Sequence, residues 1–178
     1  MMVTQTVTPL LVRAHQEDPL RYAEKQQHFM DVIVWSSIAI ALGIYLLASP
    51  AIRILYGEEY LHAIPVLQIL AWRTVFVALQ SGSGVLILAE NLQRCVAIRN
   101  FVGLIVSVVV NYLLIPVWGI VGSAIATVMA TAFAGYFSHM FIKPYRHLVP
   151  VQTNALFLGW LRVLHWIQGN TLRVLNRT

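Results

Sequence analysis

Long stretches without a charged side chain are the feature that most limits how this sequence can fold. The first covers residues 32–49, 18 positions that hold no Asp, Glu, Lys or Arg. A stretch of this length is near the lower limit for a helix that crosses a bilayer. Three more crossing helices are expected at residues 63–89, 96–117 and 120–142. The predicted fold class is therefore all-α: an integral membrane helical bundle of about four transmembrane helices, followed by a C-terminal amphipathic helix.

The overall composition agrees with a membrane protein. Of the 178 residues, 58% are hydrophobic and 11% are charged, whereas a soluble domain typically carries about 25% charged residues. The formal net charge of +5 would suggest nucleic acid as a partner of a soluble protein. No cluster of arginines interleaved with aromatic residues is present, so we expect no nucleic-acid partner. Cys95 is the only cysteine, which excludes an intrachain disulfide.

Proline and glycine mark the predicted ends of the spans. Pro50 is expected to end the first span, because proline cannot continue a helix without losing a hydrogen bond. Gly57 is expected to form a turn in the connector that follows. Pro116 and Gly119 are expected to break the chain between the third and fourth spans.

Two amphipathic segments flank the predicted spans. The apolar spacing from Leu20 to Phe29 suits a helix lying along a surface. At the other end, residues 155–175 predict an interfacial amphipathic helix with tryptophans at headgroup level. A fifth, short span is the alternative there, and Arg162 and His165 argue against it. The predicted domains are an amphipathic cytoplasmic lead-in at 1–31, a four-span domain at 32–142, and a basic cytoplasmic tail with the interfacial helix at 143–178.

Positive charge is concentrated on one side of the predicted topology. Four spans put both termini and the connector between the second and third spans on the same side of the membrane. The opposite side has only Arg53 among the basic residues of its connectors, beside Glu58 and Glu59. The positive-inside rule therefore predicts that both termini are cytoplasmic, near membrane lipid. The basic residues on the predicted cytoplasmic side are Arg94, Arg99, Lys143, Arg146, Arg162, Arg173 and Arg177.

Small and polar side chains recur at helical spacing in the third and fourth spans. Asn100, Gly103, Ser107 and Asn111 share one face of the third span. This face lines a hydrated cavity in one interpretation, and forms hydrogen bonds between packed helices in the other. In the fourth span, two neighbouring stripes of small residues predict close packing against another helix. These stripes are Gly122, Ala126, Ala130, Ala134 and Ser138, and Ser123, Thr127, Thr131 and Gly135.

Arg73 lies inside the second predicted span, where an arginine costs on the order of 2.5–3.5 kcal/mol at the bilayer centre. Val77, Gln80 and Gly84 extend its face at helical spacing. In one interpretation the guanidinium contacts an anionic substrate; in the other it reaches the outer headgroups from a span that begins near Trp72. The candidate residues along a substrate path are Arg73, Gln80, Asn100, Ser107 and Asn111.

The patterns of common catalytic and metal sites are absent from the sequence. The six histidines are scattered and show no metal-ligand spacing, and Gly82 and Gly84 lack the third glycine and the preceding strand of a nucleotide-binding loop. No nucleophile elbow or Walker motif is present. We therefore expect neither enzymatic activity nor a metal or other cofactor.

Three segments resemble the C-terminal half of the polysaccharide-biosynthesis exporters, which include the O-antigen flippases of the multidrug/oligosaccharidyl-lipid/polysaccharide superfamily. Residues 54–70 resemble the family's Leu-Phe/Tyr-Gly-x-x-Tyr-x-x-Ala turn and the apolar helix after it. Residues 111–127 resemble its Asn-x-x-Leu-Ile-Pro-x-x-Gly-Ile-x-Gly-Ala-Ala-x-Ala-Thr segment, and Pro9 to Tyr22 resemble the lead-in to the same half. The resemblance covers roughly residues 8–145.

The resemblance implies flipping of a lipid-linked oligosaccharide across the bacterial inner membrane during cell-surface polysaccharide synthesis. Arg73 would then suit the sugar or phosphate, although the family motif does not include this position. Members have about twelve to fourteen spans, so this chain is expected to be a fragment, or a half that works with a separate N-terminal half. The alternatives are a membrane remnant or scaffold protein without transport, and a membrane-embedded transferase, which predicts clustered acidic or histidine residues that the sequence lacks.

Overall fold

The computed structural model describes residues 19–90, 92, 94 and 96–175, with side chains from Tyr22 to Arg162. Its described elements, all of them helical, are listed here in chain order. They are α2 (Pro19–Tyr56), η1 (Glu58–Tyr60), α3 (Ala63–Ala89), α4 (Val96–Ala132), η3 (Phe133–Phe137), α5 (Ser138–Phe141), η4 (Lys143–Tyr145) and α6 (Leu148–Leu175).

Helix α2 is longer than the first predicted span at both ends. The expected surface helix from Leu20 to Phe29 is wrong as a separate element, because these residues are the beginning of α2. The prediction that Pro50 ends the span is also wrong, since α2 continues to Tyr56. Proline is tolerated inside membrane helices where neighbouring groups satisfy the backbone that it leaves unpaired. The helix ends instead before Gly57, whose φ of 80° only glycine adopts without strain and which forms the predicted turn.

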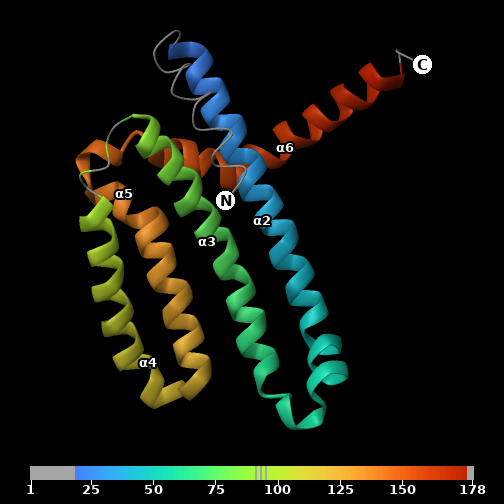
Figure 1. Cartoon of the computed structure of the whole chain (residues 1–178), viewed down its shortest axis with the longest axis vertical. Coiled ribbons are helices and arrows are strands. Elements are labelled where there is room, and N and C mark those ends of the chain that lie inside the picture. The colour runs from blue at the N-terminus through green and yellow to red at the C-terminus, as the bar shows by residue number, and fades with distance from the viewer. Residues whose placement is uncertain (1–18, 91, 93, 95, 176–178) are drawn as a thin grey trace.

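Three described helical stretches are long and apolar enough to cross a membrane: Tyr22–Tyr56, Ala63–Ala89 and Val96–Phe141. The last of them reverses direction at Gly119, where φ is 54° and ψ is −128°, as Figure 1 shows at the far end of α4. Pro116 remains inside the helix and the break falls at Gly119 alone. The chain therefore makes four passes, which we call the first (α2), second (α3), third (residues 96–118) and fourth (residues 120–141). The predicted all-α membrane bundle is confirmed.

The two ends of the bundle differ in what they contain. The turn at Gly57 and the reversal at Gly119 lie at one end, and the beginning of α2 and the α3–α4 connection lie at the other (Figure 1). Helix α6 also belongs to this second end, where it runs across the other helices and then away from them (Figure 1). We call this second end the α6 end. It contains the exposed Lys143 and Arg146, whereas the opposite connector contains Glu58 and Glu59.

The small residues of the fourth pass form a packing face, as predicted. Every member of the first stripe is buried, namely Gly122, Ala126, Ala130, Ala134 and Ser138. A Cβ built on Gly103 of the third pass would lie 2.9 Å from the Cβ of Ala134. A Cβ built on Gly135 would lie 2.9 Å from the backbone oxygen of Phe76 in α3. The fourth pass therefore lies between the third pass and α3, with the backbones in close approach.

Substituting Gly103 tests this close approach. Gly103→Ala inserts a methyl group against Ala134, and we expect a loss of about 1–3 kcal/mol in the free energy of unfolding. The matched control is Gly84→Ala in α3, because a Cβ there meets no atom within 4 Å. Unfolding of both variants by SDS in mixed micelles gives the comparison. Equal stability of the two variants would show that the third and fourth passes do not pack as described.

Candidate functional site

The two predicted path residues of α3 lie together on the side that faces the fourth pass. The Arg73 side chain is exposed, and its Nε donates a hydrogen bond to Thr131 Oγ1 at 3.3 Å. Seven residues further along α3, the Cβ of Gln80 lies 3.2 Å from a Cβ built on Gly135. Thr131 and Gly135 are one turn apart on the fourth pass. The structure therefore brings Arg73 and Gln80 to one helix–helix interface.

The three predicted path residues of the third pass are not joined to that interface. Asn111 Nδ2 donates to the backbone oxygen of Ser107 at 2.8 Å, and lies 3.4 Å from the Ser107 hydroxyl. The Asn100 side chain is exposed. Gly103, which lies between Asn100 and Ser107 on the same stripe, packs on Ala134. Among the described residues, no hydrogen bond connects this stripe to Arg73 or Gln80. A single cavity lined by all five residues stays a prediction.

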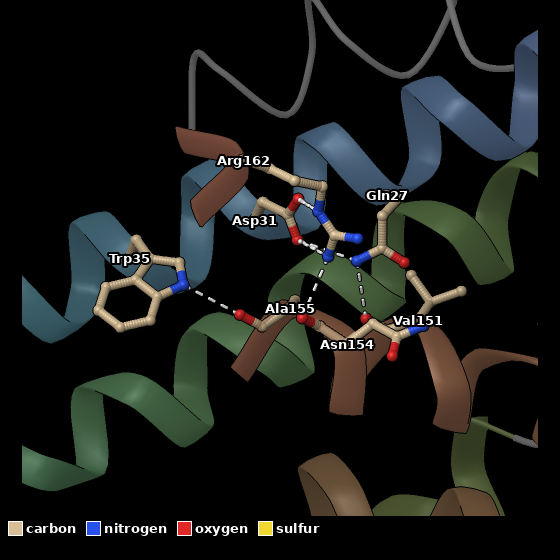
Figure 2. A network of polar contacts seen from close by, with 7 residues as sticks. All are labelled: Gln27, Asp31, Trp35, Val151, Asn154, Ala155 and Arg162. Carbon is tan, nitrogen blue, oxygen red and sulfur yellow. Dashed lines mark hydrogen bonds and ion pairs between the residues drawn. The ribbon is translucent and has the colours of Figure 1, made fainter. Parts of the chain in front are cut away.

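An ion pair that the sequence did not predict joins the buried Asp31 of α2 to the partly exposed Arg162 of α6. Arg162 Nε donates to Asp31 Oδ2 at 2.6 Å, and its Nη2 donates to Asp31 Oδ1 at 3.1 Å (Figure 2). Asp31 is fully buried, and Gln27 Nε2 donates to its Oδ1 at 2.9 Å. Trp35 Nε1 donates to the backbone oxygen of Ala155 at 3.0 Å, one turn further along α2. We call Gln27, Asp31, Trp35 and Arg162 the α2–α6 clamp.

A glycine makes the clamp possible. A Cβ built on Gly159 would lie 2.7 Å from Trp35 Nε1 and 3.1 Å from Asp31 Oδ1. Only a residue without a side chain lets α6 approach α2 this closely. No local pattern in the sequence predicts the ion pair, because Asp31 and Arg162 are 131 residues apart and each lies beside a different apolar stretch.

A second buried polar network joins α6 to α3 and the fourth pass. Gln152 is fully buried, and its Nε2 donates to Ser83 Oγ and to the backbone oxygen of Gly135. Its remaining amide atom, Oε1, lies 3.2 Å from His139 Nδ1. Since the Gln152 amide nitrogen makes both donor contacts, its oxygen is the acceptor and His139 Nδ1 is the donor. Helix α3, the fourth pass and α6 therefore meet around one amide.

A third polar contact lies where α3 ends. His147 Nε2 is 2.7 Å from Glu90 Oε2, and Tyr22 donates to Glu90 Oε1 at 2.8 Å. The hydrogen bond with Glu90 raises the pKa of His147 above its usual value, an effect that burial partly opposes. The three networks contain four buried polar side chains of the described chain, all at the α6 end: Asp31, Ser83, His139 and Gln152.

The described residues contain no group of three or more His, Cys, Asp or Glu side chains that could hold a metal ion. Two hollows of about 270 Å³ each are lined almost entirely by apolar residues. One lies between α2 and α3 near Tyr56 and Leu70, and the other lies between the third and fourth passes near Val102 and Phe141. Such apolar surfaces suit hydrocarbon chains. The buried polar networks lie instead at the α6 end, and the exposed cation Arg73 lies on α3.

The chain is similar to longer membrane proteins. It is 26% identical over 169 residues to an uncharacterized membrane protein in the cps region of Klebsiella pneumoniae, an alignment that covers 93% of this chain and 34% of that protein. It is 31% identical over 121 residues to an uncharacterized membrane protein of Methanocaldococcus jannaschii, covering 66% of this chain and 22% of that protein. No family model and no solved structure matches the chain.

The chain spans about a third of the length of the Klebsiella protein and about a fifth of the archaeal one. Both relatives are membrane proteins, which agrees with the apolar helices and supports a membrane location for this chain. The resemblance to polysaccharide exporters fits the Klebsiella relative loosely, through the cps region in its description.

Removing one partner of the α2–α6 clamp tests its contribution to stability. Arg162→Gln leaves the Asp31 carboxylate buried beside Gln27 alone, and we expect a loss of about 3 kcal/mol in the free energy of unfolding. This is the low end of the range for buried pairs, because Arg162 is partly exposed. Adding Asp31→Asn should recover part of the loss. Arg146→Gln, which removes an exposed cation, is the control; an equal effect of both single variants would contradict the clamp.

The contact between His147 and Glu90 predicts a pH dependence. A pKa raised above the unfolded value of about 6.5 means that the charged ring stabilises the fold fully below that pH. This contribution is lost as the pH rises through the raised pKa. The stability difference between the natural chain and His147→Gln should therefore shrink from pH 6 to pH 9, by no more than about 1 kcal/mol for so exposed a side chain. A difference that grew with pH would contradict the assignment.

Proposed function

We propose that this chain is the C-terminal helical portion of a lipid-linked oligosaccharide flippase in the bacterial inner membrane. The observation that carries the proposal is the alignment of 93% of the chain with a membrane protein in the cps region, the capsule polysaccharide gene region, of K. pneumoniae. Capsule sugars are polar and cross the membrane only with a protein that offers a polar path. The three segments that resemble polysaccharide exporters support the same function.

The exposed guanidinium of Arg73 supplies a chemical reason for this function. Arg73 is ten residues beyond Ala63, which corresponds to about 15 Å along the helix axis at 1.5 Å per residue. That is near the middle of a hydrocarbon core about 30 Å thick. A cation at this depth is costly unless it faces water, another protein segment or an anion. In the proposed flippase it contacts the phosphate or sugar of the substrate, with Gln80 on the same side of α3.

In the proposed flippase the chain acts with a partner and has a defined orientation in the membrane. A separate N-terminal half of the transporter completes the path, and the substrate is the lipid-linked oligosaccharide. Both chain termini and the α6 end face the cytoplasm, since Lys143 and Arg146 lie at that end and the acidic connector lies at the other. The protein moves its substrate without chemical change, so the proposal assigns it no catalytic residue.

The test is complementation in a capsule-producing bacterium that lacks its own flippase. The chain is expressed together with the remaining part of a longer relative, and surface polysaccharide is measured. We expect polysaccharide to appear only when both parts are present. Arg73→Gln should lower the amount about tenfold or more, because a hydrogen bond to a charged group contributes about 1.5–3 kcal/mol.

Matched variants separate transport from folding in this test. Arg73→Lys keeps the charge and should retain part of the activity. Arg53→Gln removes an exposed cation from the last turn of α2 and should leave the activity unchanged. Membrane amounts of each variant are measured by blotting. If both parts reach the membrane together and no polysaccharide appears, the transport function is wrong and a membrane scaffold without transport takes its place.

A further inference from the structure

Arg99, in the first turn of the third pass, is a buried cation with two unsatisfied nitrogens and no described carboxylate partner. Its side chain is 6% exposed, and its Nε and Nη1 atoms have no hydrogen-bond acceptor among the described residues. Arg99 takes part in neither of the described ion pairs, because Asp31 pairs with Arg162 and Glu90 contacts His147. An arginine cannot lose its charge in a protein. A buried guanidinium without a counter-charge is destabilising, so a bound anion that accepts hydrogen bonds from Nε and Nη1 would offset this cost.

The packing of the third and fourth passes shows what lies around Arg99. Gly103 packs against Ala134, and the two passes are antiparallel, so Arg99 lies about one turn nearer the α6 end, level with Ser138 and His139. Its charge acts on His139. His139 is fully buried, its ring stacks edge-on with Tyr145 at 5.5 Å, and its Nε2 has no hydrogen-bond partner among the described residues. Arg99 and His139 therefore belong to one buried cluster. Because His139 Nδ1 is the donor to Gln152, its Nε2 is an acceptor, and Arg99 alone offers N–H groups to an anion.

The surroundings of this cluster suit an amphiphilic anion. Arg99 is three residues inside α4, which is about 5 Å from the helix start and so near the expected headgroup level. Val102, about one turn along the third pass from Arg99, lines the hollow between the third and fourth passes. The fourth-pass side of this hollow is formed by Phe133, Ser138, Phe141 and Ile142. Exposed cations add to the positive charge of this end, namely Arg94, Lys143 and Arg146.

We propose that Arg99 binds the phosphate of an anionic membrane lipid, with the acyl chain of that lipid lying over the apolar hollow between the third and fourth passes. The phosphate oxygens accept hydrogen bonds from the guanidinium and compensate its charge, which is the interaction that arginine makes best. A lipid is favoured over free phosphate because the hollow that includes Val102, about one turn from Arg99, is largely apolar and lies along the membrane-spanning stretch Val96–Phe141. The site does not depend on Arg73 or on transport.

The first experiment uses the natural 178-residue chain, purified in a neutral detergent. Thermal unfolding is followed while phosphatidylglycerol, diacylglycerol with the same acyl chains, or inorganic phosphate is added. Phosphatidylglycerol should raise the unfolding temperature in a saturable way, and the other two should not. Equal stabilisation by diacylglycerol would show that the phosphate is not bound. Equal stabilisation by inorganic phosphate would show a free-phosphate site and overturn the lipid assignment.

The second experiment identifies Arg99 as the binding group. Arg99→Gln should weaken phosphatidylglycerol binding about tenfold or more, and should not lower the unfolding temperature in diacylglycerol, because it removes an uncompensated charge. If Arg99 had a purely structural role, Arg99→Gln would lower the unfolding temperature in diacylglycerol. Arg99→Lys keeps a cation and should bind with intermediate affinity, which also decides the question if Arg99→Gln does not fold. The control Arg53→Gln removes an exposed cation from the opposite end of the bundle and should bind like the natural chain. Unchanged binding by both Arg99 variants would overturn the proposal.

A negative result here leaves the proposed transport function untouched. Complementation depends on Arg73 and on a partner half, whereas lipid stabilisation is measured on the isolated chain. Conversely, lipid binding at Arg99 would persist in a membrane protein that transports nothing.

Discussion

The ion pair between Asp31 and Arg162 determines how the last part of the chain is attached to the bundle. Asp31 is fully buried in α2, and without a cation its charge would have to be neutralised or exposed. Arg162 supplies that cation from α6, and Trp35 and Gln27 add hydrogen bonds to the α6 backbone. Once α6 is fixed across α2, Gln152 reaches Ser83 and Gly135, which links α6 to α3 and the fourth pass.

This attachment makes the two ends of the bundle chemically different. At the end of the Gly57 and Gly119 turns, the chain reverses over short connections that need little more than a glycine with positive φ. At the α6 end, buried carboxylate, amide, imidazole and guanidinium groups lie among the helices. Polar groups of this kind are costly in lipid unless they are satisfied, so their concentration at one end favours a position near the membrane surface. Recognition of polar headgroups is therefore expected at the α6 end.

Features that depend on residues close together in the sequence were predicted, whereas contacts between residues far apart in the sequence were not. The four passes, the turns at Gly57 and Gly119 and the small-residue face of the fourth pass all come from local periodicity and were predicted. Pro50 was misread because the rule that proline ends helices is weaker inside membranes. The clamp was missed because its two charges are 131 residues apart. Of the five predicted path residues, two share an interface, and their role in transport remains a prediction.

Arg73 and Arg99 show why the position of a charge along a membrane sequence does not determine its role. Arg73 is inside the second span and was predicted as a candidate residue of the substrate path, and its side chain is exposed and contacts Thr131. Arg99 is near the beginning of a span and was predicted to be one of the basic residues on the cytoplasmic side, yet it is buried with its Nε and Nη1 unsatisfied. Burial removes the water that would otherwise solvate a guanidinium, so the need for an anion is greater at Arg99. An exposed cation such as Arg73 is solvated when no ligand is present, so it can bind a ligand transiently. A transport path requires transient binding, whereas a lipid site such as the one proposed at Arg99 can stay occupied.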